Sequence, residues 1–189
     1  YDKSLKDAPY DVEKAQALIK EAGADNIAIN LWYMPVQRPY NPNAKLMAEM
    51  LQADWAKVGV DAKLVTYEWG EYLKRAAKGE PDVILAGWTG DNGDPDNWLG
   101  SLLSCDAVGG NNYSRWCNKD FDSLVTQARQ VTNQDERVTD YVKAQQIFKE
   151  QLPWTTMAHS VVTVFTAPNV VDYKISPLGQ IRFDGVKVE

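Results

Sequence analysis

The hydrophobic pattern of the chain switches between short apolar runs and longer stretches in which apolar residues recur every three or four positions. The short runs are typical of buried strands, and they lie at 27–34, 60–67 and 82–88. The periodic stretches predict helices, and they lie at 11–22, 42–58, 71–78, 95–103, 119–130 and 135–152. The alternation of strand and helix in the first half of the chain predicts an α/β layer with a mostly parallel sheet flanked by helices.

Two of these helices are expected to begin with the same local signal, an N-cap side chain followed by proline. The expected caps are Asn41 and Asp94. Pro42 and Pro95 follow them at the first helical position, where the missing N–H of proline costs nothing. Gly23 is the expected C-terminal cap of the first helix. These signals place two loops directly between a strand and a helix.

The two strand-to-helix loops carry a candidate pair of binding residues. Arg38 follows the strand at 27–34, and Asp91 lies on the glycine-flanked loop after the strand at 82–88. Ligands of open α/β sheets bind at the carboxyl edge of the strands, where both loops should emerge. We therefore expect Arg38 and Asp91 to face one crevice, which suits a ligand with an anionic and a cationic end. Taken alone, Asp91 is also explained as a turn residue and Arg38 as a solvated surface arginine.

Composition narrows the class of protein. The net charge of −6 disfavours nucleic acid as a partner, because no basic stripe is present to neutralise phosphates. No apolar run reaches the roughly 18 residues that span a bilayer. The chain starts at Tyr1 with a polar stretch, without a signal peptide or an initial methionine. For an exported protein, this start would mean a mature or truncated form.

The two cysteines, Cys105 and Cys117, flank a loop rich in glycine and asparagine. A metal site is disfavoured, because two thiols and one histidine do not complete a zinc site and no C-x-x-C motif occurs. We expect a disulfide that closes this loop, which requires an oxidising compartment.

Other candidates for chemistry are weaker. The acidic run after Asp91 does not follow the calcium loop of the EF-hand, because Gly93 and Pro95 occupy ligand positions and Leu102 stands where glutamate belongs. The single histidine, His159, is expected to be partly buried in an apolar, strand-like run rather than catalytic. A Ser-His-acid triad is formally possible, but no nucleophile-elbow motif occurs in the sequence to support it. Most of the seven tryptophans are expected in the core, but Trp88 could cover a ligand side chain.

The last part of the chain has a different character. Residues 155–167 form a continuous β-branched run, and the segment from about 165 onward contains prolines and glycines before a final apolar triplet at 186–188. We expect residues 1–165 to form most of one α/β ligand-binding lobe. Residues 166–189 are then a β-containing crossing segment that returns toward another lobe.

Four motifs resemble the periplasmic dipeptide-binding proteins of bacterial ABC importers, within the peptide and oligopeptide solute-binding family. They are QRPYNP (37–42), YEW (67–69), GWTGDNGDP (87–95) and NYSRWC (112–117). The resemblance implies a periplasmic-binding-protein-like lobe in which Asp91 binds the α-ammonium of a peptide and Arg38 its carboxylate. Trp88, Thr89 and Tyr40 complete the expected ligand-binding set. The family's proteins are more than twice as long, so the resemblance covers only their C-terminal portion.

This resemblance implies capture and delivery of dipeptides in the periplasm, with no enzymatic activity, no cofactor and no metal. The implied partners are a dipeptide, the membrane permease of an ABC importer and the missing N-terminal lobe of the same protein. Two alternatives remain open at this point. One is a lobe that binds oligopeptides or another small solute, and the other is a glycoside hydrolase with a pair of carboxylates about 5–9.5 Å apart.

Overall fold

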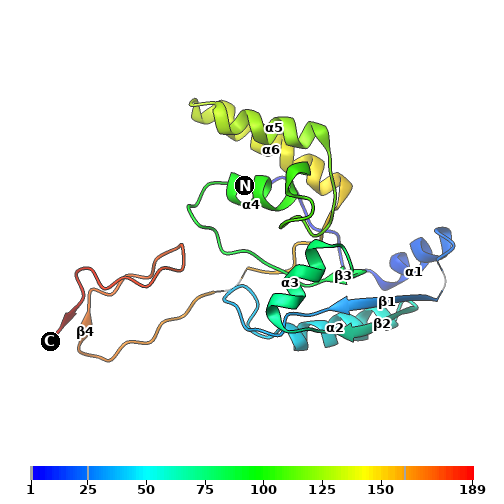
Figure 1. Ribbon diagram of the computed structural model, residues 1–189, viewed down its shortest axis with the longest axis horizontal. Helices are drawn as coiled ribbons and strands as arrows, with labels where there is room; N and C mark the ends of the chain where they lie inside the picture. The colour runs from blue at the N-terminus through cyan, green and yellow to red at the C-terminus, as the bar shows by residue number, and fades with distance from the viewer. Residues whose placement is uncertain (1, 25, 160) are drawn as a thin grey trace.

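The computed structural model describes residues 2–24, 26–159 and 161–189 and contains a parallel sheet, six helices along these residues and an extended C-terminal segment (Figure 1). The helices are α1 (Val12–Glu21), α2 (Ala44–Ala56), α3 (Trp69–Ala77), α4 (Asp96–Leu103), α5 (Lys119–Gln130) and α6 (Gln134–Gln151), and Cys105–Ala107 form a 3₁₀ turn. The strands are β1 (Ile27–Trp32), β2 (Val60–Val65), β3 (Val83–Ile84), β4 (Val170–Val171) and β5 (Lys187–Val188).

The sheet of the first half confirms the predicted α/β layer. Its order is β2-β1-β3, and both pairs are parallel, as consecutive β-α-β units require. β1 pairs with β2 from Ile27 opposite Val60 to Trp32 opposite Val65, whereas it pairs with β3 only at Val83 and Ile84. β3 is therefore much shorter than the run at 82–88 predicts. The carboxyl ends of β1 and β3 lie together at one edge of the sheet.

Each face of the sheet buries different side chains, because successive residues of a strand point to opposite faces. Leu31 of β1 packs with Ala48 of α2, and Met47, Leu51 and Trp55 of the same helix lie against this cluster. Trp32 packs with Tyr72 of α3, which is fully buried. The Tyr72 hydroxyl donates a hydrogen bond of 2.7 Å to the carbonyl of Leu85. α3 thereby fixes the chain just beyond the end of β3.

The helices α4, α5 and α6 form a second packed group around Leu103, Phe121, Val125 and Ala144. Figure 1 shows α5 and α6 side by side, with α4 next to them. Cys105 and Cys117 form a disulfide with a Cα–Cα distance of 4.5 Å, as expected from the sequence. The bond closes the loop between α4 and α5, where Trp116 packs its ring against Phe121.

The start of α2 differs from the one that the sequence predicts. Asn41 is not the cap of α2: the cap is Asn43, whose side chain accepts a hydrogen bond from the Leu46 N–H. Asn41 is buried in a tight turn, where its backbone N–H and carbonyl both bond to Arg38. Pro42 then lies before α2 rather than at its first position.

α1 forms where the sequence predicts it and ends at the expected glycine. Gly23 has a φ of 63°, and the N–H groups of Gly23 and Ala24 bond to the carbonyls of Lys20 and Ile19, a Schellman arrangement. Its apolar residues are not enclosed, however, because Leu18 remains 54% exposed. The helix therefore forms from local signals without a covered apolar face among the described residues.

Among the helices that the structure describes, none combines the length and the apolar character that a membrane span needs.

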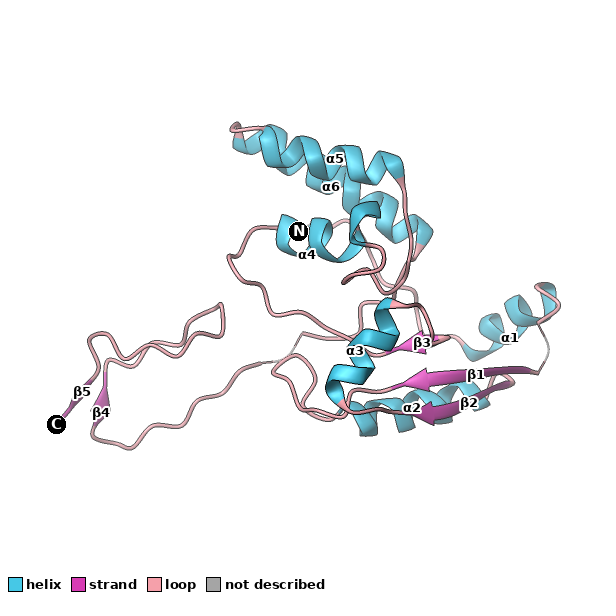
Figure 2. Ribbon diagram, viewed as in Figure 1, coloured by secondary structure: helices cyan, strands magenta, loops and turns pink. Residues whose placement is uncertain are grey.

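The β-branched run after α6 does not form the strand that its composition suggests. Residues 155–159 and 161–167 contain no strand, and their side chains are exposed, with Phe165 at 92%. His159 is exposed as well, so the prediction of a partly buried histidine in a strand is wrong. Figure 2 shows this segment as a loop that leads to the short antiparallel pair β4–β5. Without a neighbouring strand to pair with, an apolar sequence alone does not fix a sheet.

Candidate functional site

The two loops that carry the candidate residues meet at the carboxyl edge of the sheet. They follow β1 and β3, which are parallel neighbours, and so they emerge on the same side. The Tyr40 ring of the first loop lies directly against Gly87 of the second, so closely that a Cβ at Gly87 would overlap the ring. The expectation that the two loops lie together is therefore confirmed at the level of the backbone.

Arg38 is held by a turn and by aromatic rings. Its backbone pairs with Asn41, and its guanidinium donates a hydrogen bond of 3.0 Å to the carbonyl of Gln37. The guanidinium also lies 4.8 Å from the centre of the Trp69 ring, a cation–π contact. Burial raises the pKa of the Tyr40 hydroxyl, and the positive charge of Arg38 opposes that rise. Arg38 and Tyr40 therefore lie close enough to interact, on the side of the loop that faces α3.

Asp91 is held by one amide side chain. The Asn97 Oδ1 accepts a hydrogen bond of 2.9 Å from the Asp91 N–H, and the Asn97 Nδ2 donates one of 3.0 Å to the Asp91 carboxylate. The same Asn97 Oδ1 accepts a hydrogen bond of 2.8 Å from the Trp88 indole. Trp88 also packs at the edge of the core formed by α4, α5 and α6. Two predicted site residues, Asp91 and Trp88, are thus connected through a residue that sequence reasoning missed.

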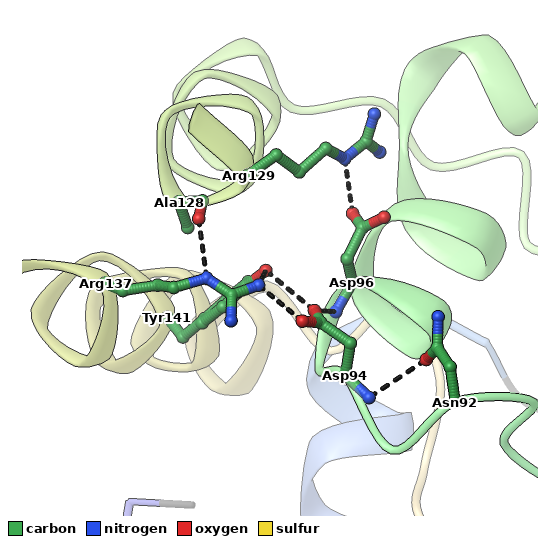
Figure 3. Close-up of polar contacts among 7 residues, drawn as sticks. All are labelled: Asn92, Asp94, Asp96, Ala128, Arg129, Arg137 and Tyr141. Carbon is green, nitrogen blue, oxygen red and sulfur yellow. Dashed lines mark hydrogen bonds and ion pairs between the residues drawn. The ribbon is translucent and has the colours of Figure 1, made fainter. Parts of the chain in front are cut away.

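Three residues beyond Asp91, Asp94 anchors the loop to the helix pair (Figure 3). The N-cap position of α4 is held by Pro95, one residue later than the sequence predicts. Asp94 nevertheless accepts a hydrogen bond from the Asp96 N–H at 2.9 Å, at the first residue of the helix. Its other oxygen lies 2.6 Å from Nη2 of Arg137 on α6. Burial alone would raise the pKa of Asp94, but Arg137 and the Asp96 N–H outweigh it and hold that pKa below its usual value.

A second arginine strengthens this anchor. Arg129 of α5 pairs with Asp96 at 2.5 Å, while Arg137 also donates a hydrogen bond of 2.8 Å to the carbonyl of Ala128. Figure 3 shows the two arginines reaching from α5 and α6 toward the start of α4. The loop and the first turn of α4 are therefore joined to both helices by contacts between residues 33 and 43 positions apart in the chain.

The C-terminal segment reaches the same loop. A Cβ placed on Gly179 would lie 3.6 Å from the Thr89 methyl group, and one placed on Gly93 would lie 3.9 Å from the Leu178 side chain. Thr89 itself is exposed. The turn at 178–179 thus lies beside the loop that carries Asp91, a proximity that no local sequence signal indicates.

The structure brings the predicted residues together only in part. Tyr40 contacts the loop of Trp88 and Thr89, and Asp91 is joined to Trp88 through Asn97. Among the described residues, no ion pair connects Arg38 with Asp91. Their shared contact with a ligand remains a prediction.

A separate concavity of about 500 Å³ lies over β1 and β2. It is lined by residues that include Asn30, Lys63, Tyr67 and Arg75, and neither Arg38 nor Asp91 contributes to it. Arg75 lies over the Tyr67 ring and pairs with Glu80 at this place. Within residues 2–24, 26–159 and 161–189, no group of three His, Cys, Asp or Glu side chains is arranged to hold a metal ion.

Comparison with known proteins places this geometry in a family. Residues 1–110, more than half of the chain, match the family model of bacterial extracellular solute-binding proteins, family 5 Middle. The chain is 59% identical over 189 residues to Di/tripeptide-binding protein 1 of Pseudomonas aeruginosa strain UCBPP-PA14, covering 100% of this chain and 35% of that protein. It is 46% identical over 190 residues to Heme-binding protein A of Haemophilus influenzae, again covering 100% of this chain and 35% of that protein.

A solved structure has the same fold. The dipeptide-binding protein from Pseudoalteromonas sp. SM9913, in complex with Met-Leu, superposes with a TM-score of 0.82 at 36% identity, covering 95% of this chain and 36% of that chain. The chain spans about a third of the length of the curated relatives named above. The family model, which matches more than half of the chain, shows that the chain belongs to the family 5 bacterial extracellular solute-binding proteins.

Proposed function

We propose that this chain contributes one lobe of a dipeptide-binding protein, in which Asp91 binds the α-ammonium of the peptide and Arg38 binds its carboxylate. The observation that carries the proposal is the pair of opposite charges on two adjoining loops at the carboxyl edge of a parallel sheet. Arginine suits the carboxylate end, because its planar guanidinium meets a carboxylate through two parallel hydrogen bonds. Trp88, Thr89 and Tyr40 line the space between the two charges.

Fixing both charged ends selects ligand length rather than side chains. The termini of an extended dipeptide lie about 7 Å apart, since each residue spans about 3.3–3.6 Å. A longer peptide would misplace one of its charges. A blocked terminus would leave one protein charge without a partner inside a closed site, which is strongly unfavourable.

The chain is proposed to act within a longer, two-lobed protein. Residues 1–165 form most of one lobe, and residues 166–189 cross to the N-terminal lobe, which closes over the ligand by a hinge motion. The complete protein then captures the peptide in the periplasm and delivers it to the permease of an ABC importer, without chemical conversion. Membership of a solute-binding family favours this reading over a glycoside hydrolase. The 189-residue chain alone should bind dipeptides very weakly, because the opposing lobe that buries most of the ligand is absent.

Calorimetric titration of the complete protein tests the proposal. The probes are Ala-Ala, N-acetyl-Ala-Ala and Ala-Ala amide, which differ only in the charges at their ends. Ala-Ala should bind much more tightly than either blocked form. Equal affinity for all three would overturn the proposed recognition of the two termini.

A second candidate solute follows from one relative. Heme-binding protein A shares 46% identity with the whole chain, so family membership does not by itself select the dipeptide. Titration of the complete protein with heme, followed by its visible absorbance, separates the candidates. Tight binding of heme that Ala-Ala does not displace, together with no binding of Ala-Ala, would favour heme.

A further inference from the structure

Asn97 makes three hydrogen bonds that converge on the loop of Asp91. Its Oδ1 accepts from the Trp88 indole at 2.8 Å and from the Asp91 N–H at 2.9 Å, and its Nδ2 donates to the Asp91 Oδ2 at 3.0 Å. It is the second residue of α4, so its backbone is fixed by the first turn of this helix.

Only one orientation of the amide satisfies all three contacts. An asparagine side chain has an acceptor oxygen and a donor NH₂ group, and here each faces groups of the opposite kind. Turning the amide over would place its oxygen against the Asp91 carboxylate and its NH₂ group against two N–H donors. The arrangement therefore holds the carboxylate of Asp91 and the ring of Trp88 in fixed positions relative to each other.

Asp91 differs from the neighbouring carboxylates Asp94 and Asp96 in that its hydrogen-bonded partner, Asn97, is neutral. Asp94 is paired with Arg137, and Asp96 is paired with Arg129, so a protein cation already compensates each of those charges. Asn97 orients Asp91 without adding a positive charge. Asp91 is thus left as the carboxylate of this loop whose charge remains available to a cationic group of a ligand.

We infer that Asn97 is a positioning residue for the ammonium end of the ligand, setting the direction of the Asp91 carboxylate and the place of Trp88 beside it. The inference rests on the proposed function, because it assigns Asn97 a role at the site where Asp91 meets the α-ammonium. In this proposal Asn97 acts on the ligand through Asp91 and Trp88, the residues to which it is hydrogen-bonded. Its removal should weaken ligands that carry a free ammonium and leave those without one nearly unchanged.

The test compares Asn97→Ala with Asn92→Ala in the complete protein, using calorimetric titration with Ala-Ala and with N-acetyl-Ala-Ala. Asn92 is a matched control, because its Oδ1 accepts a hydrogen bond from the Asp94 N–H in the same loop, whereas no hydrogen bond among the described residues joins its side chain to the Asp91 carboxylate. Asn97→Ala should weaken Ala-Ala about tenfold, in line with the loss of a hydrogen bond to a charged group. The affinity for N-acetyl-Ala-Ala should change by less than about twofold, and Asn92→Ala should leave the ratio of the two affinities unchanged.

Further variants separate the possible failures. Because Asn97 and Asp91 act together, the double variant Asn97→Ala/Asp91→Asn should lose little more affinity for Ala-Ala than Asp91→Asn alone. If Asn97→Ala does not fold, Asn97→Ser serves in its place, and retained binding of N-acetyl-Ala-Ala reports an intact site. An equal loss for both ligands would overturn the inference. If Asp91→Asn itself fails to discriminate the two ligands, the proposed function fails; if Asp91→Asn discriminates and Asn97→Ala does not, only the role of Asn97 fails.

Discussion

The loop that carries Asp91 and the loop that carries Arg38 are held in place by different kinds of contact. The Asp91 loop is fixed by hydrogen bonds and ion pairs that reach α4, α5 and α6, through Asn97, Arg129 and Arg137. The Arg38 loop is fixed by a backbone turn and by aromatic rings, with Tyr40 against Gly87 and Arg38 over Trp69. One end of the proposed ligand thus meets a polar network and the other an aromatic surface.

This difference has a consequence for binding. Directional hydrogen bonds fix the position of a carboxylate closely, which suits a compact ammonium group. A guanidinium that contacts the face of a ring can still direct N–H groups of its own plane toward a carboxylate. Changes in the helical group should therefore act on the Asp91 end, and changes near α3 should act on the Arg38 end.

The largest effect on stability is expected from the disulfide at the end of α4. Replacing Cys105 and Cys117 by serine should destabilise the chain by about 3 kcal/mol, because a loop of this size then gains freedom in the unfolded state. Denaturant unfolding of the oxidised protein and the double variant measures the difference. Hydrogen exchange should rise in α4 and the Asp91 loop before the Arg38 loop. Equal loosening of both loops would contradict the division between them.

A smaller effect is expected at the contact between the two loops. Gly87→Ala places a methyl group into the Tyr40 ring and should cost about 2 kcal/mol, as overpacking usually does. Gly70→Ala is the control, because its methyl group would lie 3.1 Å from one carboxylate oxygen of Glu68 and would not overlap a ring. Thermal unfolding of the two variants checks the difference. If Gly87→Ala were as stable as Gly70→Ala, the Tyr40 ring would not be closely packed against Gly87.

The smallest effect is expected from pH, through Asp94. Its pKa is lower in the folded chain than in the unfolded chain, so its contribution is present above about pH 4 and is lost as the pH falls through the folded-state pKa. The pair with Arg137 is partly exposed, so the contribution should be about 1 kcal/mol. Stability measured between pH 5 and pH 2 should fall less in Arg137→Ala than in the unchanged protein. An identical pH dependence would show that this anchor contributes nothing.

The sequence predicts the fold well where local signals agree with packing. Helix α5 spans Lys119–Gln130 as expected, because its apolar spacing, its asparagine cap and its buried Phe121 all favour the same element. Asn41 and Asn43, on either side of Pro42, are the same residue type and suit the N-cap equally well in the sequence. The backbone turn between Arg38 and Asn41 occupies Asn41, and Asn43 caps α2. The apolar run at 155–167 lacks a strand partner in the described part of the chain, so its composition misleads.

The candidate site is predictable to a lesser degree. Loops after adjacent parallel strands must emerge together, which is why the proximity of Tyr40 and Gly87 follows from the order of elements. The roles of Asn97 and Arg137 leave no local pattern, since hydrogen bonds between separate segments depend on the folded arrangement. The proximity of Thr89 to the turn at 178–179 likewise leaves no local signal in the sequence.

The most direct test of the central claim compares Asp91→Asn and Arg38→Ala in the complete protein against the three alanine dipeptides. Asp91→Asn should weaken Ala-Ala and Ala-Ala amide by about 2–5 kcal/mol, as removal of one partner from a buried charge pair does, and should leave N-acetyl-Ala-Ala nearly unchanged. Arg38→Ala should weaken Ala-Ala and N-acetyl-Ala-Ala similarly and leave the amide nearly unchanged. If instead Asp91→Asn weakened free and N-acetylated ligands equally, Asp91 would be a structural turn residue, and the proposed direction of the bound peptide would be wrong.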